Sequence, residues 1–367
     1  MAKDMLLGQV LIVGAGAIGG VTGITLHQND IDVSFVNRKS AHFDKVKKDG
    51  IIIEGQEKPV KIPIYSSLKD VGRKFEHILV VVKNLNTEEV MKNIKHVSTD
   101  KTLVYSMQNG FGNTDIMRKY LPENQVVAGV VGWGANKIAP GVIRITSTSG
   151  DFIIGFEHKK SSDDPKLLQM QKWLNFWKRT EVADNILGFR WSKLVVNSII
   201  APMGGLLGWT LGELVQDPRT AKIIMDLKDE GIFIGEAQKI ELEKVDNIDI
   251  RSFFYRPKPK DGFFKKLKNK TLSAIIKRVS VKRHGKIRSS LLWDLENGRK
   301  TEVDFLNGYI ARKAKELGLE VPVNSFLVKA IHEIEDGKRE IGEQNLSELQ
   351  AIADISREKV KEQERQL

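Results

Sequence analysis

The stretch QVLIVGAGAIGG, residues 9–20, decides the fold of the first half of the chain. It opens with a short apolar run, which is typical of a strand buried on both faces of a parallel sheet. Gly14, Gly16 and Gly19 then form the pattern G-x-G-x-x-G, and a helical stretch follows from about residue 17 to residue 28. The glycine pattern alone is not specific. Between a strand and a helix, however, it predicts a turn that binds a dinucleotide.

Each position in this turn has a physical role. Gly14 permits the tight turn, Gly16 lets a pyrophosphate approach the backbone, and Gly19 lets the helix pack on the strand. Ala17 and Ile18 open the helix, where backbone N–H groups have no partner within the helix and can bind phosphate. We therefore expect these five residues to bind a cofactor. A tight turn with a purely structural role is the alternative.

The residues after the second strand bear on the choice of cofactor. The stretch DVSFVNR ends at Arg38, followed by Lys39, where an NAD-binding protein usually carries an acid for the ribose 2′-hydroxyl. A guanidinium can instead bind a 2′-phosphate in bidentate fashion. The sequence therefore predicts NADPH as the cofactor, with an exposed loop arginine of no function as the alternative.

Further apolar runs extend the pattern through the first half of the chain. They are HILVVVK (77–83), TLVYSMQNG (102–110) and VVAGVVGWG (126–134), with GVIRITS (141–147) and DFIIGF (151–156) as an expected antiparallel extension. Strands that alternate with helices predict a Rossmann-type, doubly wound α/β domain. From residue 165 onward the pattern becomes helical. We expect a dinucleotide-binding domain over residues 1–185 and an all-helical domain over residues 186–367.

Two polar residues follow directly after predicted strands. Lys83 follows one strand, and Asn109 lies in the QNGFGN turn after the next strand. The carboxyl ends of the strands in a doubly wound sheet frame the ligand crevice. Topology therefore places both residues beside the cofactor, although an Asn-Gly turn is also a common structural device.

Composition excludes several kinds of site. The chain has no cysteine, which excludes disulfides, thiolate nucleophiles and cysteine-based metal sites and fits a reducing, cytoplasmic setting. Its seven histidines show no ligand spacing, so no metal site is predicted. With 41% apolar residues, 367 residues are enough for two hydrophobic cores.

The positive charge is concentrated in one insert, at about residues 246–288. Residues 251–288 contain fourteen Lys and Arg and one acid, so the rest of the chain is close to neutral although the formal net charge is +11. A helical pattern there groups apolar residues near one face: Phe264, Leu267, Leu272, Ile275, Ile276 and Val279. Such a helix either caps the protein's own core or lies on an anionic membrane. Nucleic-acid binding is not expected, because no recognisable module is present.

In the helical half, the stretch RWSKLVVNSIIAPMGG (190–205) carries a polar stripe. Lys193, Asn197 and Ala201 are spaced by four residues and share one helical face. Pro202 disfavours helical geometry at Ala201, so we expect the helix to bend or end there. The structural alternative is a lysine whose stem lies along apolar surface beside a hydrogen-bonded asparagine.

Two further motifs follow the insert. The string TEVDFLNG begins with Thr301 and Glu302, where we expect a helix to start and where an acid would interact favourably with the helix dipole. A carboxylate that pairs with Lys193 is the alternative role of Glu302. Ser289 and Ser290 either cap the helix that follows them or bind a ligand carboxylate.

Taken together, these motifs resemble the ketopantoate reductase (2-dehydropantoate 2-reductase) family over nearly the whole chain apart from the insert. The shared strings, in order, are GAGAIGG, VVVK, QNGFGN, WSKLVVN and SSLLWDLENGRKTEVDFLNG. The resemblance implies a two-domain enzyme that uses NADPH to reduce a 2-oxo acid to a 2-hydroxy acid, with 2-dehydropantoate and pantothenate biosynthesis as the first expectation. A non-catalytic NADP(H)-binding protein that contacts a membrane or partner through residues 251–288 is the alternative. A homodimer stays open beside a monomer.

The resemblance also implies roles for individual residues. The family lysine that matches Lys193 acts at the substrate carbonyl, and the glutamate that matches Glu302 contacts substrate and helps to organise that lysine. Asn109, Asn197 and Ser290 match residues that position cofactor and substrate. The chemistry agrees, because hydride addition creates an alkoxide that a proton-donating cation stabilises.

The sequence departs from the family at two positions. Ala201 and Leu211 stand where well-studied bacterial members have asparagines. Hydrogen bonds to charged groups contribute roughly 1.5 to 3 kcal/mol each, so an unchanged pocket would bind the usual substrate poorly. We therefore expect either replacement contacts or a different 2-oxo acid with fewer polar groups.

Overall fold

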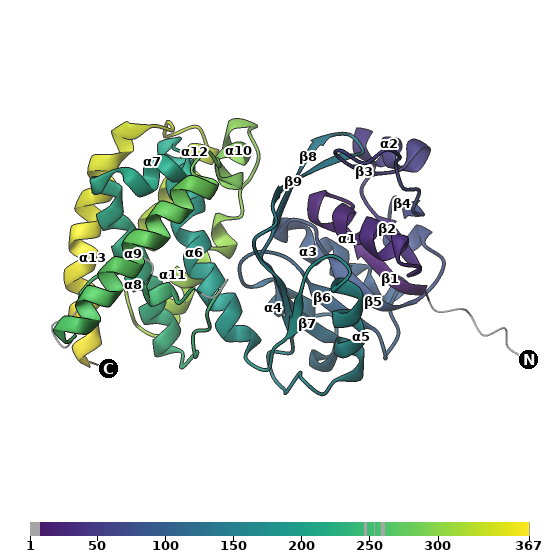
Figure 1. The fold of residues 1–367 in the computed structure, drawn as a ribbon, viewed down its shortest axis with the longest axis horizontal. Helices are drawn as coiled ribbons and strands as arrows, with labels where there is room; N and C mark the ends of the chain where they lie inside the picture. Colours follow the sequence, from purple (N-terminus) through teal and green to yellow (C-terminus); the bar gives the residue numbers. More distant parts are fainter. Residues whose placement is uncertain (1–7, 246–247, 253, 258–260, 367) are drawn as a thin grey trace, which may run out of the picture. The chain divides into compact units, whose positions relative to one another are not determined.

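The computed structural model describes residues 8–245, 248–252, 254–257 and 261–366 (Figure 1). The chain divides into two compact units, residues 1–186 and residues 187–367. The first unit is a mixed α/β unit and the second is helical, which confirms the predicted fold class. Within the described part of the chain, no helix is both long and apolar enough to cross a membrane.

An eight-stranded sheet forms the centre of the first unit. In spatial order its strands are β11 (Thr180–Val182), β10 (Phe152–Gly155), β7 (Val126–Val131), β6 (Leu103–Ser106), β5 (Phe75–Val80), β1 (Gly8–Val13), β2 (Val33–Val36) and β4 (Ile64–Tyr65). Neighbouring strands are parallel except β7 and β10, which are antiparallel. The chain passes from β1 to β2 on one side and returns to β5 on the other. The carboxyl ends of β1 and β5 therefore flank the switch point where ligands bind in such sheets.

Helices pack on both faces of this sheet. They are α1 (Ala17–Gln28), α2 (Ala41–Asp49), α3 (Thr87–Lys92), α4 (Asn113–Arg118) and α5 (Pro165–Leu174). Alternate residues of β1 point to opposite faces, because side chains along a strand alternate. Ile12 packs in one core cluster with residues of α1 and α5, and Leu11 packs in the other with residues of α3 and α4.

One strand prediction was wrong. The stretch GVIRITS does not extend the main sheet. It forms β9 (Val142–Ser147) in a second sheet, between β3 (Ile52–Ile53) and β8 (Gly134–Ala139). Ile143 is buried but Arg144 is exposed, so β9 has one polar face and is unsuited to a sheet covered on both sides. A Cβ on Gly20 of α1 would lie 2.3 Å from Cδ1 of Ile143, so this small sheet packs closely on α1.

The second unit consists of helices. They are α6 (Ile186–Leu207), α7 (Leu211–Gln216), α8 (Pro218–Ala237), α9 (Phe263–His284), α10 (Ser290–Glu296), α11 (Asn307–Glu316), α12 (Pro322–Glu335) and α13 (Leu346–Gln366). The predicted helix start at Thr301 and Glu302 was wrong. A 3-10 turn, Val303–Phe305, follows Glu302, and Leu306 has φ −108° and ψ −103°, outside helical geometry. The α-helix therefore begins only at Asn307.

A buried carboxylate joins three helices of this unit. Glu230 on α8 accepts hydrogen bonds from the backbone N–H groups of Val323 (2.8 Å) and Asn324 (2.9 Å), which open α12 after Pro322. The Ser356 hydroxyl of α13 donates to the same carboxylate at 2.5 Å. Burial raises the pKa of Glu230 to about 7. The charged C-terminal segment is therefore a helix, α13, that is held on α8 and α12.

A buried histidine lies in the centre of the main sheet. The Nδ1 atom of His77 on β5 is 2.9 Å from the Tyr105 hydroxyl, and its Nε2 atom is 3.3 Å from Oε1 of Gln169. Burial lowers the pKa of His77 to about 4. The folded state therefore holds a neutral imidazole at a pH where the unfolded chain would be protonated.

Acid should therefore destabilise the protein through His77. The unfolded chain takes up this proton near pH 6.5 and the folded chain only near pH 4, so stability falls as the pH drops through this interval. We expect a loss of about 3 kcal/mol from this group between pH 7 and pH 4. Urea unfolding of the wild type and of His77→Gln at both pH values measures it. The exposed His27→Gln variant is the control, and parallel pH profiles for wild type and His77→Gln would contradict the assignment.

Candidate functional site

The glycine turn has the geometry that the sequence predicts. Gly14 has φ +111°, and a Cβ there would lie 3.0 Å from the carbonyl carbon of Val81. A Cβ on Gly19 would lie 2.1 Å from the carbonyl oxygen of Gly14, so both positions need glycine. A Cβ on Gly16 would meet nothing within 4 Å, and no side chain caps α1 at this residue. The turn thus leaves open space before a helix N-terminus, and it fits a dinucleotide pyrophosphate.

A histidine that the sequence analysis missed supports this turn. The backbone N–H of Gly141 donates to Nδ1 of His42 at 3.0 Å, so Nδ1 carries no proton. Nε2 then carries the proton and donates to the Ala15 carbonyl at 2.6 Å. Burial is the largest influence on the pKa of His42 and lowers it, which favours this neutral form. No spacing pattern could reveal His42, because its partners lie 27 and 99 residues away in the chain.

The predicted residues at the strand ends lie along one edge of the sheet. Arg38 follows β2 with an exposed side chain, and its carbonyl accepts hydrogen bonds from Asn37 (3.0 Å) and Ser40 (3.3 Å). Lys83 and Asn109 are exposed beyond β5 and β6, which are neighbouring strands. The structure therefore places these three residues and the glycine turn at the carboxyl edge of β1, β2, β5 and β6.

Three buried amides hold this edge together. Asn84 and Asn113 donate to the Asn109 carbonyl at 2.7 and 3.3 Å. Gln108 donates to the Val82 carbonyl at 2.9 Å, which connects the end of β6 to the end of β5. Within the string QNGFGN, only Asn109 was predicted to lie at the site. The neighbouring amides in that string were the available signal.

In the second unit, α6 has one face that packs on α8 and a polar stripe elsewhere on its surface. Trp191 donates from Nε1 to the Gly231 carbonyl at 2.9 Å, and Val195 lies against the same glycine of α8. Lys193 and Asn197 are half-buried and lie about 120° to 160° around the helix from these two residues. The stripe therefore points away from the contact with α8.

The serines after the insert have separate roles. Ser289 caps α10, since its hydroxyl accepts from the Leu292 N–H at 3.0 Å, and it donates to the Ala201 carbonyl of α6 at 3.0 Å. Ser290 follows as the first residue of α10 and is exposed. The structure thus brings the start of α10 to the end of the polar stripe.

Of the two alternatives at Ala201, a bend or an end, the end was wrong, because α6 continues through Pro202 to Leu207. Pro202 has no N–H to donate to the carbonyl four residues earlier, which belongs to Ser198. The side-chain amide of Asn307 donates to this carbonyl at 2.9 Å. The hydrogen bond that the proline removes is therefore replaced from α11.

Glu302 lies on the segment that leads to Asn307. It is half-buried and precedes the 3-10 turn, and its carbonyl accepts from the Phe305 N–H at 3.0 Å. On one side the Thr301 N–H donates to Glu335 at 2.8 Å, and on the other Val303 is fully buried. Both sides of Glu302 are therefore anchored. Asn307 joins this segment to α6, the helix that carries Lys193, through the carbonyl of Ser198, which lies 109 residues earlier in the chain.

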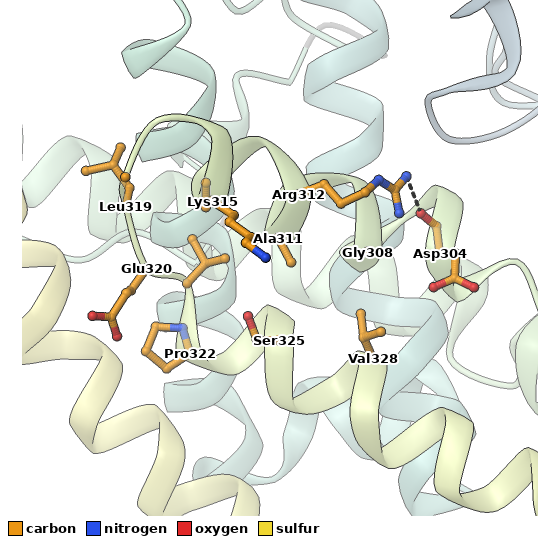
Figure 2. A pocket seen from close by; sticks show the side chains of 13 residues that line it. Asp304, Gly308, Ala311, Arg312, Lys315, Leu319, Glu320, Pro322, Ser325 and Val328 are labelled. Carbon is orange, nitrogen blue, oxygen red and sulfur yellow. Dashed lines mark hydrogen bonds between the residues drawn. The ribbon is translucent and has the colours of Figure 1, made fainter. Parts of the chain in front are cut away.

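A separate pocket of about 700 Å³ lies between α11 and α12 (Figure 2). Arg312 and Lys315 line it together with Glu320, and Arg312 donates to the Asp304 carbonyl at 3.0 Å. None of the predicted site residues lines this pocket. In the described part of the chain, no cluster of three His, Asp or Glu could hold a metal ion.

Two family models match the chain. The model described as ketopantoate reductase PanE/ApbA matches residues 10–158, and the model of its C-terminal part matches residues 185–335. The 2-dehydropantoate 2-reductase of Pyrococcus horikoshii is 28% identical over 334 residues, which are 90% of this chain and 100% of the relative. The enzyme of the same name from Streptococcus pyogenes serotype M3 is 24% identical over 325 residues, 88% of this chain and 96% of the relative.

Solved structures share the fold. A ketopantoate reductase from Ralstonia eutropha has a TM-score of 0.74 at 24% identity, and the match covers 90% of this chain and 100% of that chain. D-mandelate dehydrogenase with NADH and anilino(oxo)acetate also has a TM-score of 0.74, at 22% identity over 90% of this chain and 99% of that chain. Since the two family models together match well over half of its residues, the chain belongs to the ketopantoate reductase family and is an oxidoreductase with a nicotinamide dinucleotide cofactor.

Proposed function

We propose that this protein reduces a 2-oxo acid to a 2-hydroxy acid with NADPH, with 2-dehydropantoate as the first candidate substrate and pantothenate biosynthesis as the setting. The observation that carries the proposal is the anchoring of Lys193 and Glu302. Both side chains are half-buried, and Asn307 connects the segments that carry them. An ammonium and a carboxylate held in one unit suit the reduction of a carbonyl better than a cofactor-binding role alone.

Lys193 is the proton donor in this proposal. When bound, the nicotinamide supplies a hydride to the carbonyl carbon. As the new C–H bond forms, the electron pair of the C=O bond moves onto oxygen, and the Lys193 ammonium transfers a proton to that oxygen. Glu302 orients the ammonium and contacts the substrate. Asn197, one turn along α6 from Lys193, and Ser290 position the substrate, and Asn109 lies at the cofactor edge.

The cofactor assignment rests on the edge of the first unit. The open side of Gly16, with Ala17 and Ile18 behind it, accepts the pyrophosphate. Lys83 adds a positive charge at the same edge. Arg38 is exposed directly beyond β2, where the 2′-substituent of the adenosine ribose lies in this type of fold. A guanidinium there favours the 2′-phosphate of NADPH over the hydroxyl of NADH.

The substrate pocket differs from that of well-studied family members at two positions. Ala201 is half-buried on the polar stripe, and Leu211 is half-buried at the start of α7. Neither side chain can hydrogen-bond. This supports a 2-oxo acid with an apolar substituent as the second candidate substrate, within the same reaction. The likeness to D-mandelate dehydrogenase, described in complex with NADH and anilino(oxo)acetate, supports this second candidate.

The proposal also includes a homodimer of this chain. A ketopantoate reductase from Staphylococcus aureus that shares the fold, with a TM-score of 0.68, is described as dimeric. This likeness is the present support for a homodimer of this chain.

The first test is turnover. NADPH oxidation is followed with 2-dehydropantoate and with apolar 2-oxo acids such as 2-oxoisovalerate and phenylglyoxylate, and compared by kcat/KM. Lys193→Ala should lower kcat by about 10²- to 10⁴-fold, because the proton donor is lost. Its Kd for NADPH should stay unchanged. Lys222→Ala, an exposed lysine on α8, is the control.

Two outcomes would contradict this proposal. Tight NADPH binding without turnover of any 2-oxo acid would favour the non-catalytic alternative. Full activity of Lys193→Ala would refute the role of the lysine while leaving the reaction itself in place.

The second test concerns the cofactor. Arg38→Ala should weaken NADPH binding by about 10- to 150-fold, which corresponds to the loss of a charge-assisted hydrogen bond, and should leave NADH binding nearly unchanged. Isothermal titration with both cofactors measures this. Lys39→Ala, the neighbouring exposed cation, is the matched control. Equal losses for both cofactors in Arg38→Ala would refute recognition of the 2′-phosphate.

The third test concerns Asn307 as a positioning residue. Asn307→Ala should lower the free energy of unfolding by about 1 to 3 kcal/mol and lower kcat, because the Ser198 carbonyl loses its donor. In a Pro202→Ala background the helix regains its own N–H donor, so the cost of Asn307→Ala should be smaller by about 1 kcal/mol. Urea unfolding and kcat of the four proteins measure this coupling.

The control is Asn345→Ala. This buried amide also contacts α6, at the Leu206 carbonyl, but it does not replace the bond that Pro202 removes. Its cost should be equal in both backgrounds. Additive effects of Asn307→Ala and Pro202→Ala would show that the amide does not compensate for the proline.

A further inference from the structure

Helix α9, within the basic insert, packs with its polar face inward. Among its described side chains, those of Lys266, Asn269, Ser273, Lys277 and Val281 are half-buried and recur at intervals of three or four residues, which places them on one face; four of the five are polar. The Ser273 hydroxyl accepts a hydrogen bond from the Tyr255 backbone N–H at 3.2 Å. The face of α9 that meets the protein is therefore mainly polar.

The opposite side of α9 is apolar and exposed. Its large apolar side chains expose between 38% and 84% of their surface; they are Phe263, Phe264, Leu267, Leu272, Ile275 and Val279. We call these six residues the apolar face of α9; the side chain of Ile276, which the sequence assigned to this face, lies outside the described residues. An amphipathic helix of a soluble domain usually buries such a face against its own core. This helix does the reverse, so the alternative in which its apolar face caps the protein's own core does not hold.

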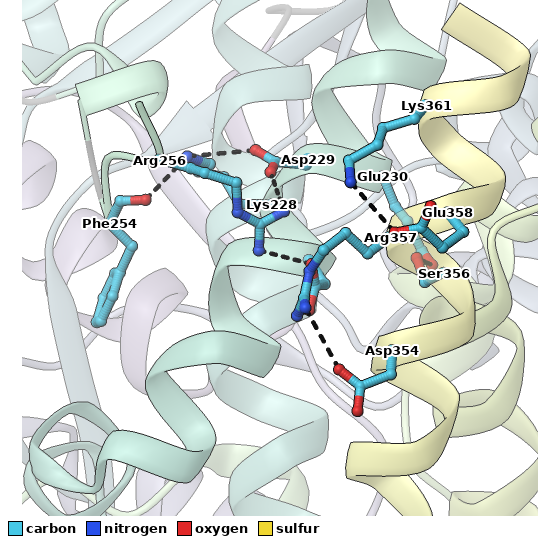
Figure 3. Close-up of polar contacts among 11 residues, drawn as sticks. Lys228, Asp229, Glu230, Phe254, Arg256, Asp354, Ser356, Arg357, Glu358 and Lys361 are labelled. Carbon is cyan, nitrogen blue, oxygen red and sulfur yellow. Dashed lines mark hydrogen bonds and ion pairs between the residues drawn. The ribbon is translucent and has the colours of Figure 1, made fainter. Parts of the chain in front are cut away.

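The insert is fixed to the rest of the second unit. Arg256 donates to Asp226 at 2.6 Å and to Asp229 at 2.9 Å, and buried Lys228 donates to the Phe254 carbonyl at 3.0 Å (Figure 3). Beyond the other end of α9, the N–H groups of residues 211 and 212 donate to the carbonyls of residues 287 and 285. The apolar face is therefore presented by an anchored helix and not by a loose tail.

The charge of α9 indicates what the apolar face contacts. The sequence of α9 contains eight Lys and Arg and no acid. Lys268, Arg278 and Lys282 are exposed among the apolar side chains. A second copy of this helix would bring like charges together. A nucleic acid would account for the cations but not for six exposed apolar side chains. An anionic lipid surface accounts for both.

We propose that α9 docks the protein on anionic membranes. The apolar face enters the boundary between lipid headgroups and acyl chains, and the surrounding lysines and arginines contact the anionic headgroups. A helix of 22 residues is about 33 Å long, so it lies along the surface and presents its whole apolar face to the lipid. This proposal is independent of the substrate and of the reaction.

The test uses the full chain and vesicles of defined composition. Sedimentation with vesicles of 70% phosphatidylcholine and 30% phosphatidylserine should show binding, and pure phosphatidylcholine should bind at least tenfold less. Raising the salt from 50 to 500 mM should weaken binding to the anionic vesicles, because it screens the attraction of the cations. The double variant Phe263→Ser/Phe264→Ser should lose at least tenfold in affinity. Phe176→Ser, an exposed phenylalanine after α5, is the matched control and should bind as the wild type does.

The absence of cysteine allows a direct measurement of insertion. Leu267→Cys, labelled with an environment-sensitive fluorophore, should show a blue shift on anionic vesicles. The same label at Phe176→Cys should not. Unchanged thermal unfolding of each variant shows that the fold is intact, because these side chains point away from the protein.

Three results would overturn the proposal. Binding that Phe263→Ser/Phe264→Ser leaves unchanged, with no blue shift at position 267, would mean that the apolar face does not enter the lipid. Binding to an oligonucleotide in preference to anionic vesicles would assign the cations to nucleic acid. A dimer that this double variant dissociates, without vesicle binding, would mean that a second copy covers the face.

Discussion

The packing of the second unit depends on a network of buried hydrogen bonds. The network includes the side-chain bond that replaces one missing backbone bond of α6. Pro202 cannot donate to the Ser198 carbonyl, and Asn307 donates in its place. The same amide donates to Oδ1 of Asn324 at 2.9 Å, and Asn324 donates to Glu230 at 2.7 Å. Five helices, α6, α11, α12, α8 and α13, are thereby connected through polar groups. A buried donor or acceptor that loses its partner is costly, so these hydrogen bonds favour one packing of the five helices.

The parts of the fold that local sequence determines were predicted. The glycine turn is one example, since Gly14 and Gly19 are required by contacts within twenty residues or with the adjacent strand. The alternation of apolar runs and helical stretches gave the α/β unit for the same reason. β9 was misplaced because periodicity indicates that a segment is a strand but does not indicate which sheet it joins.

The parts that distant residues determine were not predictable. A proline inside an apolar helix usually indicates a bend or an end, and here an amide about a hundred residues away satisfies the carbonyl that it leaves. The hydrogen bonds of His42 were unpredictable for the same reason, because the two groups that it joins lie in separate loops. For the candidate site, the sequence named Lys193 and Glu302 but could not relate them. The structure relates the segments that carry them through Asn307.

The neutral histidine behind the glycine turn links the state of that turn to a proton. His42 holds one proton, on Nε2, and the lone pair on Nδ1 is the acceptor for Gly141. A second proton, on Nδ1, would place an N–H donor opposite the N–H donor of Gly141. The hydrogen bond would be lost, and the β8–β9 turn would be released from the glycine turn. Thermodynamic reciprocity then applies: a ligand that binds only the intact turn must make His42 harder to protonate. Under the proposed binding of the dinucleotide at this turn, its occupancy and the protonation of His42 on α2 are therefore two measures of one equilibrium.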